Sequence, residues 1–263
     1  MILDSVGKIS SPVRPGPAGL RVGVLLQDYR GPFVPGDMGN ASSYPCPVVF
    51  QMVSGATSKR MFQGDPTLEE PILAAALSLE AQGVKAITSD CGFFIRYQAA
   101  VARHVRIPVC LSSLMLLAII PQLMGSQRKI GIITANATAL DETVLRLSGV
   151  TALETLIVKG LERESYFGSN VTGNCTELDT DGLETEVTDV AIRMKREVPR
   201  LGALLLECSM LPPYSRAVQV ATGLPVFDFM TLVRFFCSPT ASRNDIRHGI
   251  VASWSPVQPH RRS

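Results

Sequence analysis

The sequence lacks the features that mark membrane, secreted and nucleic-acid-binding proteins. Its longest purely apolar run covers residues 114–120, far short of the roughly 20 residues of a membrane-spanning helix. Residues 1–19 have no apolar core of the kind found in signal peptides. The formal net charge of +2 comes from scattered lysines and arginines, not from a massed basic patch. We therefore expect a cytoplasmic protein that binds neither membrane nor nucleic acid.

Motifs for metals, nucleotides and disulfide scaffolds are also missing. Six cysteines in 263 residues are too dilute for a disulfide scaffold and include no CxxC pair. We therefore expect reduced thiols and no zinc site. There is no P-loop, and no GxGxxG follows a strand. The three histidines, His104, His248 and His260, lie away from the predicted strand ends, so a cysteine–histidine hydrolase would need His248 to fold back.

What the sequence does contain is a duplication that places one cysteine in each copy. Cys91 follows Asp90, and Cys208 follows Glu207. Each cysteine has a tyrosine six residues later and an Ile/Leu-Pro-Val at positions +16 to +18. The other cysteines, Cys46, Cys110, Cys175 and Cys237, are interpreted as small buried hydrophobic residues.

The duplication extends upstream to the strands that open the two halves. Residues 21–28 and 129–136 share the order basic, apolar, Gly, apolar, apolar. The offset is 108 residues at these strands (129 − 21) and 117 at the cysteines (208 − 91). An inexact period of this kind fits two related domains better than a solenoid.

Continuous apolar strands alternate with helical segments along the chain, which predicts parallel sheets covered on both faces. The expected fold class is α/β, with two pseudosymmetric doubly wound domains and the active site in the cleft between them. We assign residues 1–128 plus 229–263 to the first domain and 129–228 to the second. The predicted strands and helices lie at 21–27, 47–53, 68–81, 84–89, 94–105, 112–124, 130–134, 153–158, 182–197 and 203–206, with a short strand at Pro108, further helices after Asp141 and Pro213, and a terminal helix at 230–236.

The topology predicts where a ligand binds. In open α/β sheets, ligands lie beyond the carboxyl ends of the strands, and both Cys91 and Cys208 follow a predicted strand. The two opening strands end in further polar side chains, which we expect in the same cleft: Gln27, Asp28, Thr134 and Asn136.

The position of the thiols suggests proton-transfer chemistry. A helix N-terminus favours the thiolate and lowers the pKa of a cysteine from about 8.5. The neighbouring acids, Asp90 and Glu207, would oppose this, but strand alternation predicts that they point to the opposite face. One thiolate can then remove a proton from a carbon acid while the other thiol delivers one to the opposite side. Backbone amides at the same place can hold the substrate carboxylate and stabilise the charge beside it.

Together, the duplicated halves, Asp90-Cys91-Gly92 and Glu207-Cys208-Ser209 resemble the aspartate/glutamate racemase superfamily, which includes hydantoin and allantoin racemases. The resemblance covers residues 21–236. It implies two pseudosymmetric domains, catalysis without pyridoxal phosphate or metal, and Cys91 and Cys208 as the acid/base pair. It also implies that the residues just after the cysteines, Gly92, Phe93 and Ser209, contact the substrate, and Tyr214 could line the pocket.

The residues after the cysteines depart from the glutamate racemase pattern. That pattern has Asn-Thr after the first cysteine and Thr-His after the second, where this chain has Gly92-Phe93 and Ser209-Met210. Phe93 and Phe94 suggest apolar walls suited to a cyclic or aromatic substrate. Asp28 either holds a substrate ammonium or caps the following loop. The loop 31–44 is either a lid or anion-binding turn, or a solvated connection.

The expected function is a cofactor-independent racemase or epimerase that uses two cysteines on an amino acid or a hydantoin-like substrate. Its partners would be a small-molecule carboxylate or hydantoin, and a second copy of the chain in a homo-oligomer. Three alternatives stay open. Two are a maleate-isomerase-like member, which keeps both cysteines, and an arylmalonate-decarboxylase-like member, which keeps only the second. The third is a non-catalytic small-molecule binding protein.

Overall fold

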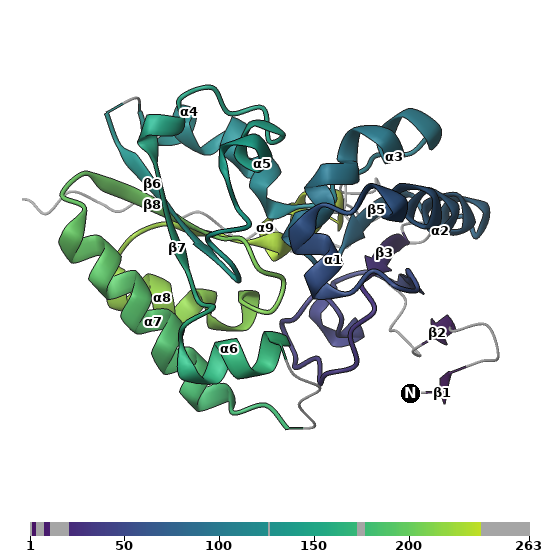
Figure 1. Ribbon diagram of the computed structural model, residues 1–263, viewed down its shortest axis with the longest axis horizontal. Helices are drawn as coiled ribbons and strands as arrows, with labels where there is room; N and C mark the ends of the chain where they lie inside the picture. Colours follow the sequence, from purple (N-terminus) through teal and green to yellow (C-terminus); the bar gives the residue numbers. More distant parts are fainter. Residues whose placement is uncertain (1, 4–7, 11–20, 126, 173–176, 238–263) are drawn as a thin grey trace, which may run out of the picture.

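The computed structural model describes residues 2–3, 8–10, 21–125, 127–172 and 177–237. Two sheets, each with its own helices, lie next to each other in the molecule (Figure 1). The first sheet has the order β1-β2-β4-β3-β5 and the second the order β7-β6-β8-β9. Both contain a parallel core, so the predicted α/β class with two parallel-sheet domains is confirmed.

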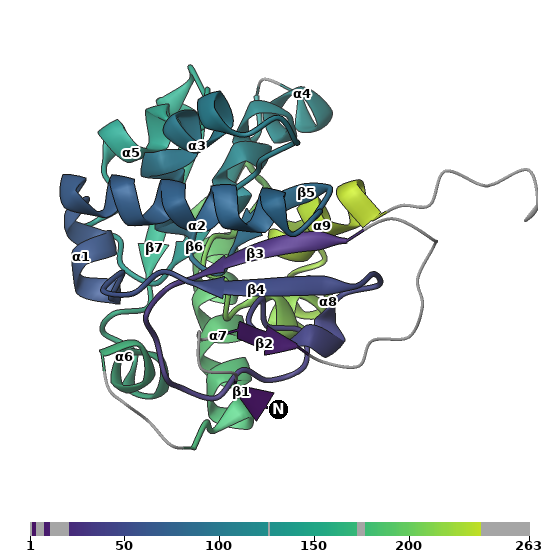
Figure 2. The ribbon, with the colours of Figure 1, turned by 90° about the vertical axis from the view of Figure 1, so that its right-hand side faces the viewer.

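The first sheet is built on β3 (Val22–Leu26), which pairs in parallel with β4 (Val48–Met52) and β5 (Ala86–Ser89). All five residues of β3 are buried because both faces are covered. Val22, Val24 and Leu26 pack with the C-terminal helix, whereas Gly23 and Leu25 face α2 (Glu69–Ala81). Figure 2 shows α2 lying along β3.

Two short strands at the edge of this sheet were not predicted. β1 (Ile2–Leu3) and β2 (Lys8–Ser10) pair with each other, and β2 pairs with β4, both in the antiparallel sense. The predicted strand near Pro108 is reduced to one bridge between Ile87 and Val109.

The helices of the first half are shorter than predicted. The segment predicted at 94–105 divides into a 3-10 helix, η3 (Gly92–Tyr97), and α3 (Gln98–His104). The segment predicted at 112–124 likewise divides into η4 (Ser113–Ala118) and α4 (Ile120–Met124).

The second sheet is wholly parallel within the described residues. Its strands are β6 (Lys129–Thr134), β7 (Leu156–Gly160), β8 (Leu201–Leu206) and β9 (Val226–Phe227). Side chains of β6 alternate between two cores: Ile130 and Ile132 join the core shared with the first half, whereas Ile133 joins the core under α7. The helices are α5 (Glu142–Arg146), α6 (Ser165–Thr172), α7 (Thr180–Glu197) and α8 (Ser215–Thr222).

The last helix, α9 (Phe229–Cys237), packs against the first sheet, although it follows the second sheet in sequence. Phe229 and Val233 lie in one buried cluster with Val22 and Val24. Cys237 forms a disulfide with Cys46 across a sequence separation of 191 residues. The expectation that all thiols are reduced is therefore wrong for this pair, because the return of α9 brings two distant buried cysteines together. Cys175 lies outside the described residues.

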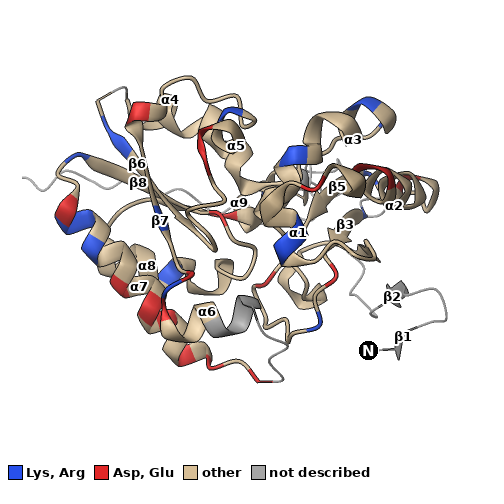
Figure 3. Ribbon diagram, viewed as in Figure 1, with Lys and Arg blue, Asp and Glu red and all other residues tan. Residues whose placement is uncertain are grey.

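Charged residues of both signs are spread over both halves, and α7 alone carries several of each (Figure 3). Of the helices in the described part of the chain, none combines the length and the apolarity needed to cross a membrane.

Candidate active site

Cys91 is placed by the end of β5. The strand stops at Ser89, and Cys91 is the N-cap of η3 with an extended backbone. The Ser89 hydroxyl donates to the carbonyl oxygen of Leu111 at 2.6 Å and to that of Cys91 at 3.1 Å. These bonds hold the turn that carries the buried thiol.

Cys208 is placed in the same way by the end of β8, which stops at Leu206. Its carbonyl accepts the backbone N–H of Leu211 at 3.0 Å, which closes a turn. The next residue, Ser209, donates its hydroxyl to the carbonyl oxygen of Asp90 in the other half. The two cysteine turns are therefore joined directly.

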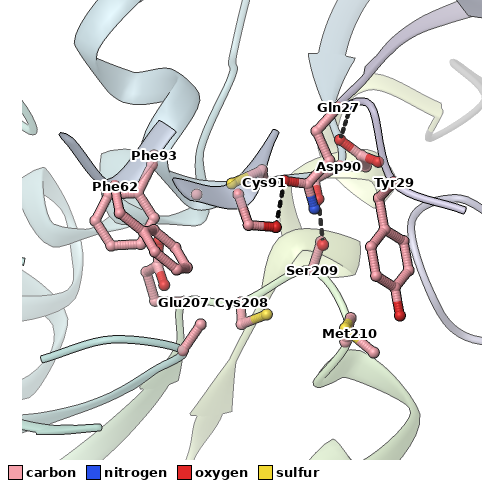
Figure 4. Close-up of a pocket in the computed structure, with 13 residues that line it drawn as sticks. Gln27, Tyr29, Phe62, Asp90, Cys91, Phe93, Glu207, Cys208, Ser209 and Met210 are labelled. Carbon is pink, nitrogen blue, oxygen red and sulfur yellow. Dashed lines mark hydrogen bonds between the residues drawn. The ribbon is translucent and has the colours of Figure 1, made fainter. Parts of the chain in front are cut away.

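One cavity lies between these turns, and the free thiols of Cys91 and Cys208 line it (Figure 4). Its volume is about 20 Å³, which is room for one water-sized group, so a substrate needs the walls to part. Thirteen residues line the cavity: Gln27, Tyr29, Ser58, Phe62, Asp90, Cys91, Gly92, Phe93, Ala135, Glu207, Cys208, Ser209 and Met210.

Asp90 and Glu207 both line this cavity, so the expectation that they point away from the thiols is wrong. Strand alternation does not apply to them because β5 ends at Ser89 and β8 ends at Leu206. The residues after each strand follow the turn instead, and this brings acid and thiol to one side.

Each acid has one satisfied and one unsatisfied oxygen. Oδ1 of Asp90 accepts the backbone N–H of Gln27 at 2.8 Å, and Oε2 of Glu207 accepts the Thr134 hydroxyl at 2.7 Å. Oδ2 of Asp90 and Oε1 of Glu207 are buried without a hydrogen-bond partner. Burial raises the pKa of Asp90 well above its ordinary value and raises the pKa of Glu207 to about 7.

The pKa values of both thiols are raised, which contradicts the expectation of lowered values. Burial is the largest cause, and the charge of Glu207 is the next for both Cys91 and Cys208. Backbone N–H groups of Phe93 and Met210 act in the lowering direction, as the interpretation of the strand ends proposed, but they are outweighed. Both thiols are therefore protonated at neutral pH.

The predicted site residues divide into two groups. Gln27, Gly92, Phe93, Ser209 and both cysteines line the cavity, whereas Asp28, Thr134, Asn136 and Tyr214 do not. Thr134 nevertheless contacts the site through Glu207.

The residues outside the cavity make local contacts. Oδ2 of Asp28 accepts the backbone N–H of Gly55 at 2.9 Å, so Asp28 holds the turn after β4 and not the loop that follows it in sequence. Oδ1 of Asn136 accepts the N–H of Ala139 at 2.9 Å. The buried hydroxyl of Tyr214 has no hydrogen-bond partner, and burial raises the pKa of this group to about 12. Phe94 is fully buried core.

Five further lining residues were not predicted from the sequence: Tyr29, Ser58, Phe62, Ala135 and Met210. Ser58 and Phe62 lie on α1 (Ser58–Gln63), a short helix that was not predicted. Its only sequence signals are Thr57 at the N-cap and Gly64 at the C-cap, where φ is +64°.

The loop 31–44 packs against the second half. The backbone N–H of Met38 donates to the carbonyl oxygen of Ser209 at 3.4 Å, and Gly36, with φ of +100°, lies against Pro213. The loop also buries Asp37, whose pKa is raised to about 7 by desolvation. The interpretation as a solvated connection is therefore wrong for its central part.

Comparisons of the sequence with known proteins identify one group of relatives. The chain is 33% identical over 222 residues to the dimethylsulfoniopropionate lyase of Durusdinium sp. clade D, which covers 82% of this chain and 73% of that protein. It is 31% identical over 218 residues to dimethylsulfoniopropionate lyase 3 of Emiliania huxleyi, which covers 80% of this chain but 57% of that protein. No protein-family model matches.

Comparisons with solved structures confirm the predicted racemase-superfamily fold. Allantoin racemase from Pseudomonas fluorescens matches with a TM-score of 0.59 at 13% identity, over 93% of this chain and 100% of that one. Arylmalonate decarboxylase matches with a TM-score of 0.55 at 15% identity, over 84% and 94%. Aspartate racemase from Picrophilus torridus matches with a TM-score of 0.52 at 15% identity, over 87% and 98%.

The two comparisons support an enzyme. The comparison with solved structures gives its fold, and the comparison of sequences gives its relatives. The fold is that of the racemases and of arylmalonate decarboxylase, and the relatives identified by sequence are named as lyases. By its sequence, the chain belongs to the family of the dimethylsulfoniopropionate lyases.

Proposed function

We propose that this protein is a lyase that cleaves dimethylsulfoniopropionate by β-elimination. The observation that carries the proposal is the pair of free cysteines, one from each half, that line one buried cavity in a relative of the dimethylsulfoniopropionate lyases. The substrate has an acidic C–H bond next to its carboxylate and a sulfonium group on the following carbon. A base in this cavity is sufficient to start the elimination.

The substrate and one cysteine thiolate account for every bond that forms or breaks in this reaction. A cysteine thiolate takes a proton from the carbon next to the carboxylate, and the electron pair of that C–H bond forms the new C=C bond. The C–S bond breaks, and its electrons leave on sulfur. The products are a cysteine thiol, neutral dimethyl sulfide and acrylate. Because dimethyl sulfide leaves without a proton, the reaction needs one base and no acid.

We assign the role of base to Cys208. Each turnover leaves a proton on the base, which must return to solvent, and Cys208 is the more exposed of the two thiols, since Cys91 has an exposed fraction of 8%. Cys91 then remains a neutral thiol on the facing turn and donates a hydrogen bond toward the charge that develops next to the substrate carboxylate.

The charge of the substrate explains how a thiol with a raised pKa can act as base. Burial and the charge of Glu207 disfavour the thiolate of Cys208 and raise the pKa of this thiol. A bound sulfonium places a positive charge in the same cavity, which favours the thiolate and lowers that pKa. The thiol is then activated only when the substrate is present.

A two-base racemase acting on an amino acid or a hydantoin is the second candidate. The facing thiols favour it, because inversion needs one acid/base group on each side of the carbon. The fold likeness to allantoin racemase agrees with this reaction as well. The two candidates differ in their products, since a racemase exchanges the proton on carbon and releases no fragment.

The direct test supplies dimethylsulfoniopropionate to the purified protein and measures dimethyl sulfide in the headspace and acrylate in solution. We expect both products in equal amounts from the wild type and neither from Cys208→Ala. A parallel set of amino acids and hydantoins in D2O is followed by NMR. Exchange of a substrate proton there, with no acrylate in the first assay, would replace the lyase with the racemase.

A further inference from the structure

The side chain of Glu207 combines full burial with an oxygen that has no hydrogen-bond partner. Oε2 is held by the hydroxyl of Thr134 at 2.7 Å, but Oε1 is buried and unpartnered. Glu207 lines the cavity between the cysteine turns. An unsatisfied buried acceptor costs free energy, so an oxygen of this kind in a ligand cavity is an acceptor available to a ligand.

The surroundings of this carboxyl are apolar on the side of the first half. A Cβ on Gly92 would overlap the carboxyl of Glu207, so only glycine allows this approach. The next residue, Phe93, stacks edge to face with Phe62, and their ring centroids are 4.9 Å apart. Figure 4 shows the two rings and Glu207 on one side of the cavity.

Several other polar groups of the cavity lie on the opposite side, and Ser58, one turn before Phe62 on α1, donates its hydroxyl to Oε1 of Gln27 at 3.3 Å. Figure 4 shows Asp90 there with Gln27 and Tyr29. The charged groups that raise the pKa of Cys208 are Glu207, Asp37 and Asp90, and all three are acidic. Among the residues that the structure describes, no lysine or arginine lines the cavity. The end formed by Glu207 and the two phenylalanines is thus a carboxyl next to aromatic rings, and this carboxyl carries its negative charge above about pH 7.

This combination matches a particular class of ligand. A cation over aromatic rings is attracted by the ring quadrupole, and most strongly where water is excluded. A primary ammonium carries three N–H donors, and this end provides one unpartnered oxygen for them. A sulfonium or a quaternary ammonium has no N–H or O–H donor. Its contact with the phenylalanine rings therefore leaves no donor without an acceptor.

We propose that Glu207, Phe62 and Phe93 form an onium subsite, which binds the dimethylsulfonium group of the substrate and selects for alkylated cations. The identity of the sulfonium rests on the proposed function. Binding of an onium ion by this subsite does not depend on turnover and can be tested separately.

The test compares ligands of matched shape by calorimetry. The quaternary ammonium ligand is 3-(trimethylammonio)propanoate, its neutral carbon counterpart is 4,4-dimethylpentanoate, and β-alanine supplies a primary ammonium. We expect the wild type to bind the quaternary ammonium at least about tenfold more tightly than either of the others. NMR of the recovered ligand checks that it was not consumed.

Two variants that each replace a carboxyl with an amide locate the subsite, with binding measured at pH 8, where Glu207 is ionised. Glu207→Gln keeps the shape and is expected to remove the preference, whereas Asp90→Asn is expected to keep it. Phe62→Leu is expected to weaken binding of the quaternary ammonium several-fold without changing that of 4,4-dimethylpentanoate. Glu207→Asp keeps the charge and is expected to restore part of the preference. Circular dichroism confirms the fold of each variant.

Equal affinity of the wild type for the charged and neutral ligands would overturn the subsite, as would a preference that survives in folded Glu207→Gln. The two proposals fail separately. Cleavage of dimethylsulfoniopropionate without a preference for the quaternary ammonium leaves the lyase and removes the subsite. A preference without cleavage supports the subsite and removes the lyase.

Discussion

The two cysteine turns have the same plan but hold their acids differently. Asp90 is fixed by a backbone N–H of Gln27, and Glu207 by a side-chain hydroxyl of Thr134. The longer side chain of Glu207 also reaches the other half, where it lies against Gly92. The shared plan brings two thiols to one cavity, and the differences give that cavity two unlike ends. A duplicated fold can in this way bind a ligand whose own ends differ.

Contacts between the halves also run in both directions. Ser209 of the second turn donates to the carbonyl of Asp90 in the first, and the loop residue Met38 donates to the carbonyl of Ser209. The geometry of each thiol therefore depends on the opposite half.

The largest effect is expected from removing the thiols one at a time. A positioned general base contributes roughly 10²- to 10⁴-fold, so we expect Cys208→Ala to lower kcat for acrylate formation by about 10³-fold or more. Cys91→Ala is expected to lower it by about 10- to 100-fold, because a hydrogen bond but no base is lost. The rates are measured by acrylate absorbance.

Equal and complete loss in both folded variants would contradict the unequal roles and favour a two-base reaction. Cys110→Ala, a free cysteine outside the cavity, is the control for loss of a buried thiol and should retain kcat.

The second prediction concerns the cross-link, which in the described residues ties α9 to the first half. Disulfides that close long loops typically stabilise by about 2 to 4 kcal/mol. We expect a reductant to lower the Tm of the wild type measured by circular dichroism. The double variant Cys46→Ser with Cys237→Ser should have a low Tm with or without reductant. If the reductant left the Tm of the wild type unchanged, the cross-link between Cys46 and Cys237 would not stabilise the fold.

The third prediction concerns how the free energy of unfolding depends on pH. Burial raises the folded-state pKa of Glu207 from 4.5 to about 7, so the protonated form is favoured by folding. Its stabilisation is complete below about pH 4.5 and is lost as the pH rises through 7, by roughly 3 kcal/mol in all. We expect a lower free energy of unfolding at pH 8 than at pH 5.5.

Glu207→Gln should reduce this slope because it removes one of the buried titrating acids. Asp37, whose pKa is also raised to about 7, keeps part of the slope in that variant, and so does Asp90, whose pKa is raised well above its ordinary value. A slope in urea unfolding that Glu207→Gln leaves unchanged would contradict the raised pKa.

The smallest effect is expected at the contact between the halves. Gly92→Ala places a Cβ against the carboxyl of Glu207, and overpacking of this kind costs about 1 to 3 kcal/mol. We expect a smaller cost when Glu207→Ala removes the obstructing carboxyl. A double-mutant cycle of urea unfolding measures the coupling. Additive effects of the two changes would show that the side chain of Glu207 does not rest on Gly92.

The sequence predicts the parallel sheets and the strand ends that carry Cys91 and Cys208, because continuous apolar strands and the repeat are local signals. The direction of Asp90 and Glu207 could not be predicted, since both follow the last residue of a strand and the pleat no longer fixes them. The raised thiol pKa values depend on how completely the two halves enclose the site, which is a property of the assembled fold.

The pairing of Cys46 with Cys237 could not be predicted either. The sequence assigns residues 229–263 to the first domain, but no local signal shows that these two cysteines, 191 residues apart, meet there. Phe62 reaches the cavity from the six-residue helix α1, which is too short for a clear periodic pattern.

The central claim is that a thiol in this cavity drives an elimination, and proton NMR of dimethylsulfoniopropionate with the protein in D2O tests it most directly. We expect the vinyl signals of acrylate and the methyl signal of dimethyl sulfide to grow together in the wild type and to be absent in Cys208→Ala. A wild-type sample, folded and with Cys208 reduced, in which the substrate persists or only exchanges its proton for deuterium would contradict it.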